Sequence, residues 1–389
     1  NKGYDVISNY GTWAKERQIE RTPLAHGATS VYSNCGSSSH GANPFLILAE
    51  NTATEDFGEA VGMALAYSGN HRMTADLGKY DVVNMSGGIA PDNFRWNLGA
   101  GESFSTPELV MSFSANGLNA LSQNFHKIVK NRVCRGAYRD ARRPVLLNLW
   151  EACSFTFTEE TVKSAADICA ELGVELLVID DGWFGQRNTD HCSLGDWYVN
   201  KKKLPGGVKR LAEKVEALGM RFGIWVEPEM VNADSDLYRA HPDWAVRIDD
   251  RPHAEGRNQL LLDLTRADVC DYLIDAMAAV FASGPISYVK WDMNRNFSDI
   301  YSHGLAAARQ GEFLYRYQQG LYRVMSTLAQ RFPHILFEGC ASGGNRFDLG
   351  MLTFGPQAWC SDDTDPIERL TIQGNLSYLY PQSTFGAHV

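Results

Sequence analysis

The sequence has little of what marks several common classes of protein. Its eight cysteines are scattered and form no Cys-x-x-Cys pair, which argues against a zinc site and against a disulfide framework. No segment approaches the roughly 18 consecutive apolar residues of a membrane span. The first residues contain no apolar run of the kind found in signal peptides. We therefore expect a cytoplasmic protein with no membrane partner.

Long runs of one charge are also missing. The formal net charge of -10 is spread over 389 residues, so nothing would draw the chain to nucleic acid. A small neutral molecule is the expected partner. The length and the ordinary hydrophobic content allow a large core, in two domains or in one barrel with an appendage.

Two regions differ in their hydrophobic pattern. Residues 1–105 are rich in Gly, Ser and Asn with short alternating runs, which predicts antiparallel β structure. The apolar residues after Pro107 recur at roughly helical spacing to about Val133, so we predict a connecting helix within residues 106–140.

From about residue 141, short apolar strands alternate with amphipathic helices, which is typical of β/α units with a parallel core. The predicted strands are 145–149, 176–179, 222–226, 286–289, 335–337 and 358–360. Polar residues follow almost every one of them. In a (β/α)₈ barrel these strand ends form one rim, where active sites are built. A doubly wound sheet is the alternative, but it seldom spreads acidic residues over so many strands.

The most informative stretch is Lys290-Trp291-Asp292, at the end of one predicted strand. A lysine two residues away on the same strand face keeps a carboxylate ionised, which is the state that a carboxylate nucleophile needs. Asp292 is therefore the candidate nucleophile.

The acids, the lysine and the tryptophans of the rim indicate sugar chemistry, because indole faces stack on sugar rings while acids and amines bind hydroxyl groups. A magnesium or calcium site is the nearest rival. Asp180 and Asp181 are adjacent on a strand, however, and so point in opposite directions, which weakens a shared metal site. We expect no metal and no cofactor.

Glycoside hydrolysis needs a second carboxyl group that donates a proton. The cluster Ser361-Asp362-Asp363-Thr364-Asp365 supplies one, since mutual repulsion lets one member keep its proton. Such a cluster alone is more often a solvated turn or a helix N-cap. His40 and His388 are interpreted as structural.

With these residues in place, the chain resembles glycoside hydrolase family 36, the bacterial-type α-galactosidases, over essentially its whole length. The resemblance rests on an ordered series of motifs. They are Asp180-Asp181-Gly182-Trp183-Phe184-Gly185, Trp225-Val226-Glu227-Pro228-Glu229-Met230, Lys290-Trp291-Asp292-Met293-Asn294-Arg295, Cys340-x-x-Gly343-Gly344-x-Arg346 and Ser361-Asp362-Asp363-Thr364-Asp365.

The resemblance implies a retaining α-galactosidase in which Asp292 is the nucleophile and Asp362 the acid/base. The implied substrate is a terminal α-galactoside of the melibiose or raffinose type. The retaining mechanism requires the two carboxyl groups to lie roughly 5–5.5 Å apart. The implied substrate-binding residues are Asp180, Asp181, Trp150, Trp225, Arg257, Lys290, Cys340 and Gly343.

The resemblance also implies the domain organisation. Residues 1–105 would be the C-terminal part of an N-terminal β-sandwich, 106–140 a helical linker and 141–389 a (β/α)₈ barrel truncated before its last strand. The nucleophile would follow strand four and the acid/base strand six, with 260–264 an excursion and 383–389 strand seven. A homo-oligomer, commonly a tetramer, is implied for the complete protein.

One departure from the family pattern concerns the turn after Cys340, where Asn345 stands in place of a glycine. Asn tolerates left-handed backbone, so we expect the turn to survive. The alternative functions within the enzyme class are an α-N-acetylgalactosaminidase and a raffinose-synthase-like galactosyltransferase. A carbohydrate-binding relative without catalysis is the alternative from another class.

Overall fold

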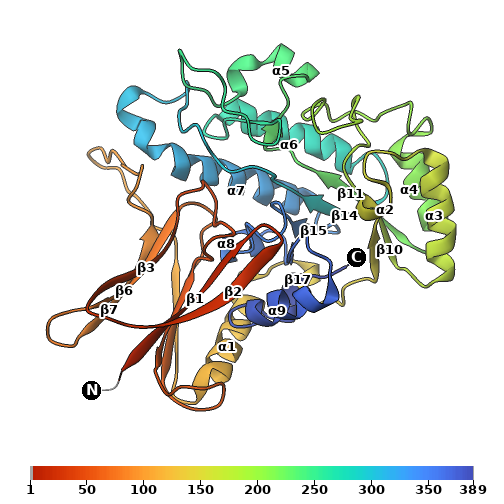
Figure 1. Cartoon of the computed structure of the whole chain (residues 1–389). Helices are drawn as coiled ribbons and strands as arrows, with labels where there is room; N and C mark the ends of the chain where they lie inside the picture. The colour runs from red at the N-terminus through yellow and green to blue at the C-terminus, as the bar shows by residue number, and fades with distance from the viewer. Residues whose placement is uncertain (1–2, 389) are drawn as a thin grey trace. The chain divides into compact units, whose positions relative to one another are not determined.

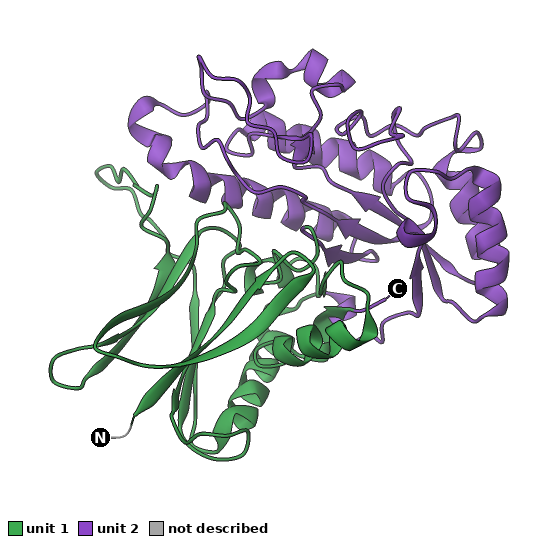
Figure 2. Ribbon diagram, viewed as in Figure 1, with its two compact units in different colours: residues 1–135, 342–386 green, residues 136–341, 387–389 purple. Residues whose placement is uncertain are grey.

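The structure is a computed structural model that describes residues 3–388. The chain divides into two compact units that do not follow the order of the sequence (Figure 2). Unit 1 combines the described residues up to Arg135 with Ser342–Gly386. Unit 2 comprises Gly136–Ala341 together with Ala387 and His388. A segment late in the chain is therefore part of the same unit as the first strands.

Unit 1 contains two antiparallel sheets, as predicted for residues 1–105. The first has the strand order β2-β1-β4-β5-β8 and the second the order β3-β6-β7. Their bounds are Tyr4–Thr12 (β1), Lys15–Pro23 (β2), Gly27–Ser33 (β3), Phe45–Glu50 (β4), Ala60–Leu65 (β5), His71–Leu77 (β6), Val83–Ile89 (β7) and Leu109–Ser114 (β8).

The helix predicted from Pro107 begins later than expected. Residues Leu109–Ser114 form β8, which pairs with β5 from Leu65↔Leu109 to Ala60↔Ser114. Helix α1 starts only at Gly117 and runs to Ile128, followed by a π-helical turn. Sheet hydrogen bonding overrides the local spacing of apolar residues here, because spacing over six residues does not distinguish strand from helix.

Unit 2 has five parallel strands, whose predicted positions are confirmed to within a few residues. They are β9 (Leu146–Asn148), β10 (Leu176–Ile179), β11 (Arg221–Val226), β14 (Ile286–Trp291) and β15 (Leu336–Gly339). Helices separate them, and α6 packs against α7 (Figure 1). The main helices are α3 (Glu159–Glu171), α4 (Gly207–Ala217), α6 (Ala267–Phe281) and α7 (Phe313–Arg331).

The two remaining parallel strands are β16 (Gln357–Trp359) and β17 (Phe385–Gly386), which pair with each other. The sheet order is β17-β16-β15-β14-β11-β10-β9, a curled seven-stranded parallel sheet. The predicted incomplete barrel is therefore confirmed. Asp292 follows the fourth strand and Asp362 the sixth, as predicted. Strand seven is shorter than the predicted 383–389, and Val389 lies outside the described residues.

The predicted excursion around residues 260–264 is also confirmed. Strands β12 (Met230–Val231) and β13 (Leu260–Leu261) form a separate antiparallel pair. The shorter helices are α2 (Trp150–Cys153), α5 (Asp236–Ala240), α8 (Leu349–Leu352) and α9 (Pro366–Leu376). Thr158 is the N-cap of α3 and accepts the Thr161 backbone N–H in a capping box.

Candidate active site

Polar side chains gather where the parallel strands of unit 2 end. Asn148 closes β9, Asp180 follows β10, Glu227 follows β11 and Asp292 follows β14. All four are buried. Because carboxyl ends of parallel strands meet at one edge, these groups from four strands converge there, as the sequence predicted. Burying them requires that each be hydrogen-bonded.

Donors from two side chains and from the backbone hold the Asp292 carboxylate, in addition to the Cys340 thiol. Oδ2 accepts the Trp225 indole N–H (3.1 Å) and the Asn294 side-chain amide (2.7 Å), and Oδ1 accepts the Met293 backbone N–H at 2.9 Å. These bonds fix the plane of the carboxyl group.

The charge of Asp292 is also stabilised. Burial alone would raise its pKa, but the Lys290 ammonium, the Asn294 amide, the Cys340 thiol and the Arg257 guanidinium together lower that pKa below its ordinary value. Asp292 is therefore ionised at neutral pH in a site shielded from water. That combination is what a carboxylate nucleophile requires.

A second buried carboxyl group lies close enough to Asp292 to interact with its charge. Burial, followed by the negative charge of Asp292, raises the pKa of Glu227 to about 8. Glu227 binds the Gln259 side-chain amide at 2.9 Å and the Asn294 backbone N–H at 2.5 Å. At neutral pH it keeps its proton and adds no second negative charge beside the nucleophile.

The adjacent acids Asp180 and Asp181 point to different partners, as predicted from strand geometry. Asp180 Oδ2 accepts the Lys290 ammonium (3.0 Å) and the Asn148 amide (2.6 Å). Asp181 accepts two parallel bonds from the Arg187 guanidinium, at 2.8 and 2.9 Å. Within residues 3–388 no cluster of three or more His, Cys, Asp or Glu side chains is arranged to hold a metal ion.

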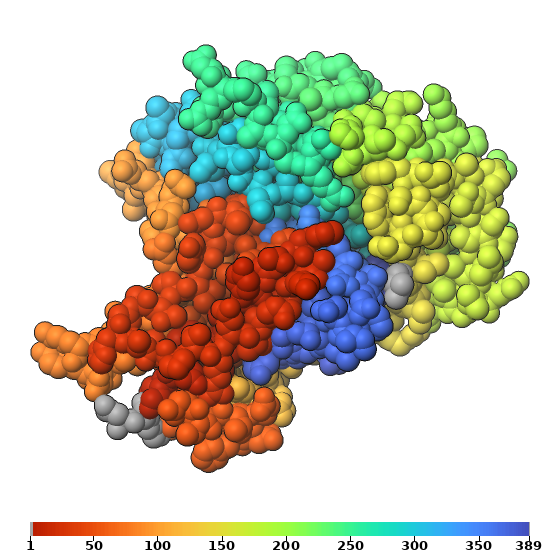
Figure 3. Space-filling model, viewed as in Figure 1, coloured from red at the N-terminus to blue at the C-terminus, as the bar shows by residue number. Residues whose placement is uncertain are grey.

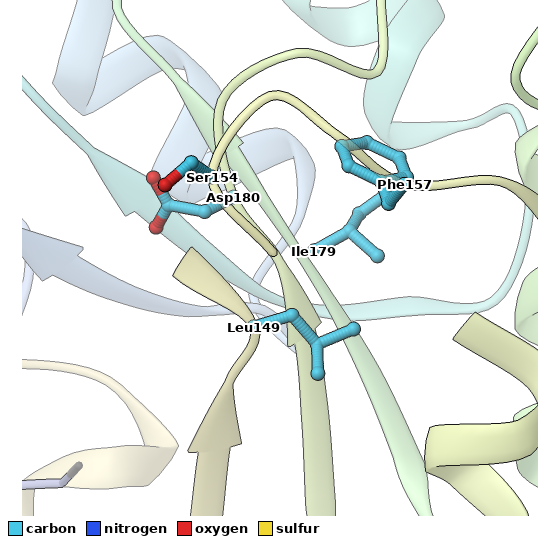
Figure 4. A pocket seen from close by; sticks show the side chains of 5 residues that line it. All are labelled: Leu149, Ser154, Phe157, Ile179 and Asp180. Atoms are coloured by element: carbon cyan, nitrogen blue, oxygen red, sulfur yellow. The ribbon is translucent and has the colours of Figure 1, made fainter. Parts of the chain in front are cut away.

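A small hollow borders this group of residues (Figure 4). Leu149, Phe157 and Ile179 form its apolar wall, and Ser154 and Asp180 supply the polar atoms. The hollow has no room for a water molecule. Its one carboxylate, Asp180, is held in place by the Lys290 ammonium.

The other predicted binding residues of unit 2 occupy different environments. Trp225 is only 1% exposed. Its indole N–H donates to Asp292, and its ring packs against the Phe184 ring. Trp150 is half-buried at the start of α2, edge-on to Phe155. Arg257 is exposed with a left-handed φ of 53°, and its charge acts on Asp292. Trp225 therefore offers substrate far less surface than a stacking platform does.

The predicted acid/base, Asp362, follows β16 in unit 1 and is half-buried. Each of its oxygen atoms accepts an indole N–H. Trp13 donates to Oδ2 at 2.8 Å and Trp359 donates to Oδ1 at 3.0 Å. Asp365 instead caps helix α9 by accepting the N–H groups of Ile367 and Glu368. The acidic cluster therefore contains a helix N-cap, Asp365, as its composition suggested. It also contains Asp362, whose carboxylate is hydrogen-bonded by two indoles instead of capping the helix.

Gly343 lies directly against the segment that carries Asp362. It has a φ of 78°, and a Cβ atom there would lie 2.6 Å from Glu16 Oε1 and 2.9 Å from the Asp362 backbone nitrogen. Only glycine fits this position. The turn does not require a left-handed conformation at Asn345, because positive φ falls on Ser342 and Gly343. Asn345 stabilises the turn through its side chain, which donates to Ser37 Oγ at 3.0 Å.

Comparison with known proteins shows which family this chain belongs to. A family model described as Melibiase matches residues 103–389, and a glycosyl hydrolase family 36 N-terminal domain model matches residues 1–99. The chain belongs to glycoside hydrolase family 36. The resemblance seen in the motifs is thereby confirmed.

Individual members of family 36 are similar over nearly the whole chain. Alpha-galactosidase AgaA of Geobacillus stearothermophilus is 52% identical over 99% of this chain and 53% of its own length. Alpha-galactosidase Mel36A of Lactobacillus acidophilus is 44% identical over 100% of this chain and 53% of its own. The AgaA crystal structure superposes with a TM-score of 0.99, covering 100% of this chain and 54% of that one.

This family 36 chain thus spans about half the length of the curated relatives it matches. A variant of AgaA has been crystallised in complex with raffinose. Among the helices of residues 3–388, none is long and apolar enough to cross a membrane. Asp292 and Asp362 belong to different compact units, and the predicted separation of their carboxyl groups stays a prediction.

Sequence reasoning assigned no role to several residues that bind the carboxylates of the site. Asn294, which belongs to a quoted motif, holds Asp292, and Arg187, two residues after another quoted motif, holds Asp181. A place within or next to a motif was the available signal for these two. Trp13 lies 349 residues from Asp362 along the chain. No local pattern connects them, so only the folded structure brings them together.

Proposed function

We propose that the complete protein is a retaining α-galactosidase that removes terminal α-D-galactosyl residues from small galactosides of the melibiose and raffinose type. The observation that carries this proposal is the buried Asp292 carboxylate, which is kept ionised beside Lys290 and oriented by Trp225. Family membership and the relatives named alpha-galactosidase support it.

In the first step, an oxygen atom of Asp292 attacks the anomeric carbon and forms an ester bond to it. The bond from that carbon to the leaving oxygen breaks, and Asp362 donates its proton to that oxygen. The galactosyl group is then attached to the enzyme through Asp292. Asp362 is left ionised, with both of its oxygen atoms facing indole N–H donors.

In the second step, water attacks the anomeric carbon while Asp362 takes a proton from that water. The ester bond breaks, releasing galactose with its original configuration and returning Asp292 to the carboxylate form. Two inversions at one carbon give overall retention. No group outside the protein and the substrate is required by the balance of atoms.

Recognition of galactose is assigned to side chains that present donors and acceptors in fixed positions. Asp180, Asp181 and Lys290 would bind the ring hydroxyls, with Asp180 and Lys290 oriented by their mutual ion pair at 3.0 Å. Trp150 would form a wall, Trp225 would act chiefly through the indole N–H that it donates to Asp292, and Arg257 and the Cys340 to Gly343 turn would complete the subsite. The predicted tetramer and cytoplasmic location stay predictions.

The test is to trap the intermediate in the complete gene product. A 5-fluoro-α-galactosyl fluoride forms the ester and slows its hydrolysis, so the labelled protein can be digested with trypsin. Cleavage after Lys290 and Arg295 releases Trp291–Arg295, whose sole side-chain carboxyl is Asp292. We expect this peptide to gain the mass of one fluorogalactosyl group.

The unlabelled reaction is followed in parallel with p-nitrophenyl α-galactoside, and the anomer first released is read by NMR. Retention of configuration with a labelled Trp291–Arg295 peptide supports the proposal. Turnover with inversion, or a label on another peptide, contradicts it. Asp292→Ala is the matched negative control for both measurements.

A further inference from the structure

The hairpin formed by β1 and β2 has a tip of fixed shape. Thr12 pairs with Lys15, which leaves a two-residue connection of Trp13 and Ala14. Ala14 has a φ of 61°, a conformation that residues with a side chain adopt only when the surroundings hold it. Gly11 lets the strands approach, because a Cβ there would lie 2.7 Å from the Lys15 carbonyl oxygen.

Trp13 extends from this tip with 62% of its surface exposed. The red segment that contains it is uncovered on the face seen in Figure 3. A tryptophan this exposed adds little to a hydrophobic core. Its specific contact is the 2.8 Å hydrogen bond from the indole N–H to Asp362 Oδ2.

The same hairpin also holds the residue before Asp362. The buried Glu16 side chain accepts the Ser361 hydroxyl at 2.6 Å through Oε2 and the Gly344 backbone N–H at 3.2 Å through Oε1. Glu16 fixes the local backbone, and Trp13 reaches the carboxyl group itself. The hairpin thus makes two kinds of contact near Asp362: Glu16 binds the neighbouring residues Ser361 and Gly344, and Trp13 binds the Asp362 side chain.

We propose that Trp13 is a positioning residue of the acid/base Asp362: together with Trp359 it fixes the plane of the carboxyl group. This inference rests on the proposed function. With one donor on each oxygen, rotation of the carboxyl group breaks two bonds. Each oxygen keeps a second acceptor site for a proton or a leaving-group oxygen.

Neutral donors suit a group that must be protonated in one step and ionised in the next. The charged groups nearby make other contacts. Arg369 donates to the backbone carbonyls of Ser361 and Asp363 and lies over the Trp359 ring. Burial lowers the pKa of His40, whose Nε2 lies 2.6 Å from the Ser342 carbonyl oxygen. Asp363 Oδ1 accepts the Asp365 backbone N–H.

The buried Arg17 guanidinium donates to the Gly344 carbonyl oxygen instead. Within residues 3–388, the side-chain donors to the Asp362 carboxylate are thus both indoles. Indole donors stabilise the carboxylate without the large electrostatic bias that a cation would add. The two indoles thus orient the carboxyl group without placing a fixed charge against it.

The test compares two substrates with Trp13→Phe in the complete gene product. Melibiose has a sugar leaving group that needs protonation, whereas α-galactosyl fluoride releases fluoride with little help. We expect kcat/KM for melibiose to fall roughly 10-fold, the usual effect of losing one hydrogen bond to a charged group, with less than about a 2-fold fall for the fluoride.

Tyr10→Phe, on the same hairpin and also exposed, is the matched control and should leave both substrates unchanged. If Trp13→Phe fails to fold, benzothienylalanine at position 13 keeps the ring and removes only the N–H. Equal losses on both substrates, or none, would overturn the inference. Absence of wild-type turnover would instead refute the proposed function, so the two failures are distinguishable.

Discussion

Asp292 and Asp362 are both aspartates that follow parallel strands, yet their surroundings differ in kind. Asp292 is 5% exposed, and cationic side chains contribute to the lowering of its pKa. Asp362 is half-buried and receives its side-chain hydrogen bonds from two neutral indoles. The first environment favours the ionised form of Asp292, and the second fixes the orientation of the Asp362 carboxyl group with neutral donors.

This difference matches the two proposed roles. A nucleophile must be ionised whenever substrate arrives, so strong fixed charges beside it are useful. An acid/base group must give up and regain a proton in each cycle, so a strong fixed charge would hinder one of its steps. Environment, more than residue type, assigns these roles.

The largest expected effect comes from removing the cation beside the nucleophile. Lys290→Met leaves the buried Asp180 carboxylate without its ammonium partner and removes a charge that lowers the pKa of Asp292. We expect kcat/KM to fall roughly 10²-fold or more. Steady-state kinetics with p-nitrophenyl α-galactoside measure this.

Lys214→Met is the control for this substitution. Lys214 forms an exposed ion pair with Asp167 at 3.1 Å, and such pairs contribute little. Its activity and melting temperature should remain at the wild-type level. If Lys290→Met and Lys214→Met had equal kcat/KM values, the claim that the Lys290 charge supports Asp292 would be wrong.

A smaller effect is expected from disturbing the backbone that carries Asp362. Gly343→Ala introduces a Cβ atom against Glu16 and the Asp362 nitrogen, at a φ that favours glycine. We expect a loss of about 2 kcal/mol in unfolding free energy, together with lower activity. Gly374→Ala in helix α9 is the control, since nothing lies within 4 Å of its Cβ position. Helix propensity predicts that this control is stabilised by up to about 1 kcal/mol.

Denaturant titration of both variants measures their free energies of unfolding. Equal values for Gly343→Ala and Gly374→Ala would contradict the claim that position 343 requires glycine.

The smallest expected effect concerns the pH profile. The folded-state pKa of Asp292 is lowered, so ionisation of this group stabilises the fold at pH values above its unfolded pKa, and that contribution is lost as pH falls through the folded value. Asn294→Ala removes one cause of the lowering. The acidic limb of kcat/KM should therefore move to higher pH, with roughly a 10-fold loss at neutral pH.

Asn119→Ala, an exposed change in helix α1, provides the comparison profile. Its acidic limb should coincide with that of the wild type. An unchanged acidic limb in Asn294→Ala would mean that this amide does not influence the ionisation of Asp292.

The sequence allowed the parallel strands to be predicted and Asp292 to be singled out, because strand periodicity and the polar residue after each strand are local signals. The choice of Asp362 within its acidic cluster came from the family resemblance, and both roles stay predictions. Strand β8 was predicted as helix, since its pairing with β5 involves residues about 50 positions away. The Trp13 contact to Asp362 was out of reach for the same reason. Features that depend on neighbouring residues can thus be predicted from one sequence. Hydrogen bonds between segments far apart in the sequence can be identified only in the folded structure.

The most direct test of the two roles is the configuration of the product formed with azide by Asp292→Ala and Asp362→Ala. In Asp292→Ala, azide replaces the missing nucleophile in one displacement, so the account predicts β-galactosyl azide. In Asp362→Ala, azide attacks the galactosyl enzyme and gives α-galactosyl azide. The same configuration from both variants, or the reverse assignment, would contradict the account.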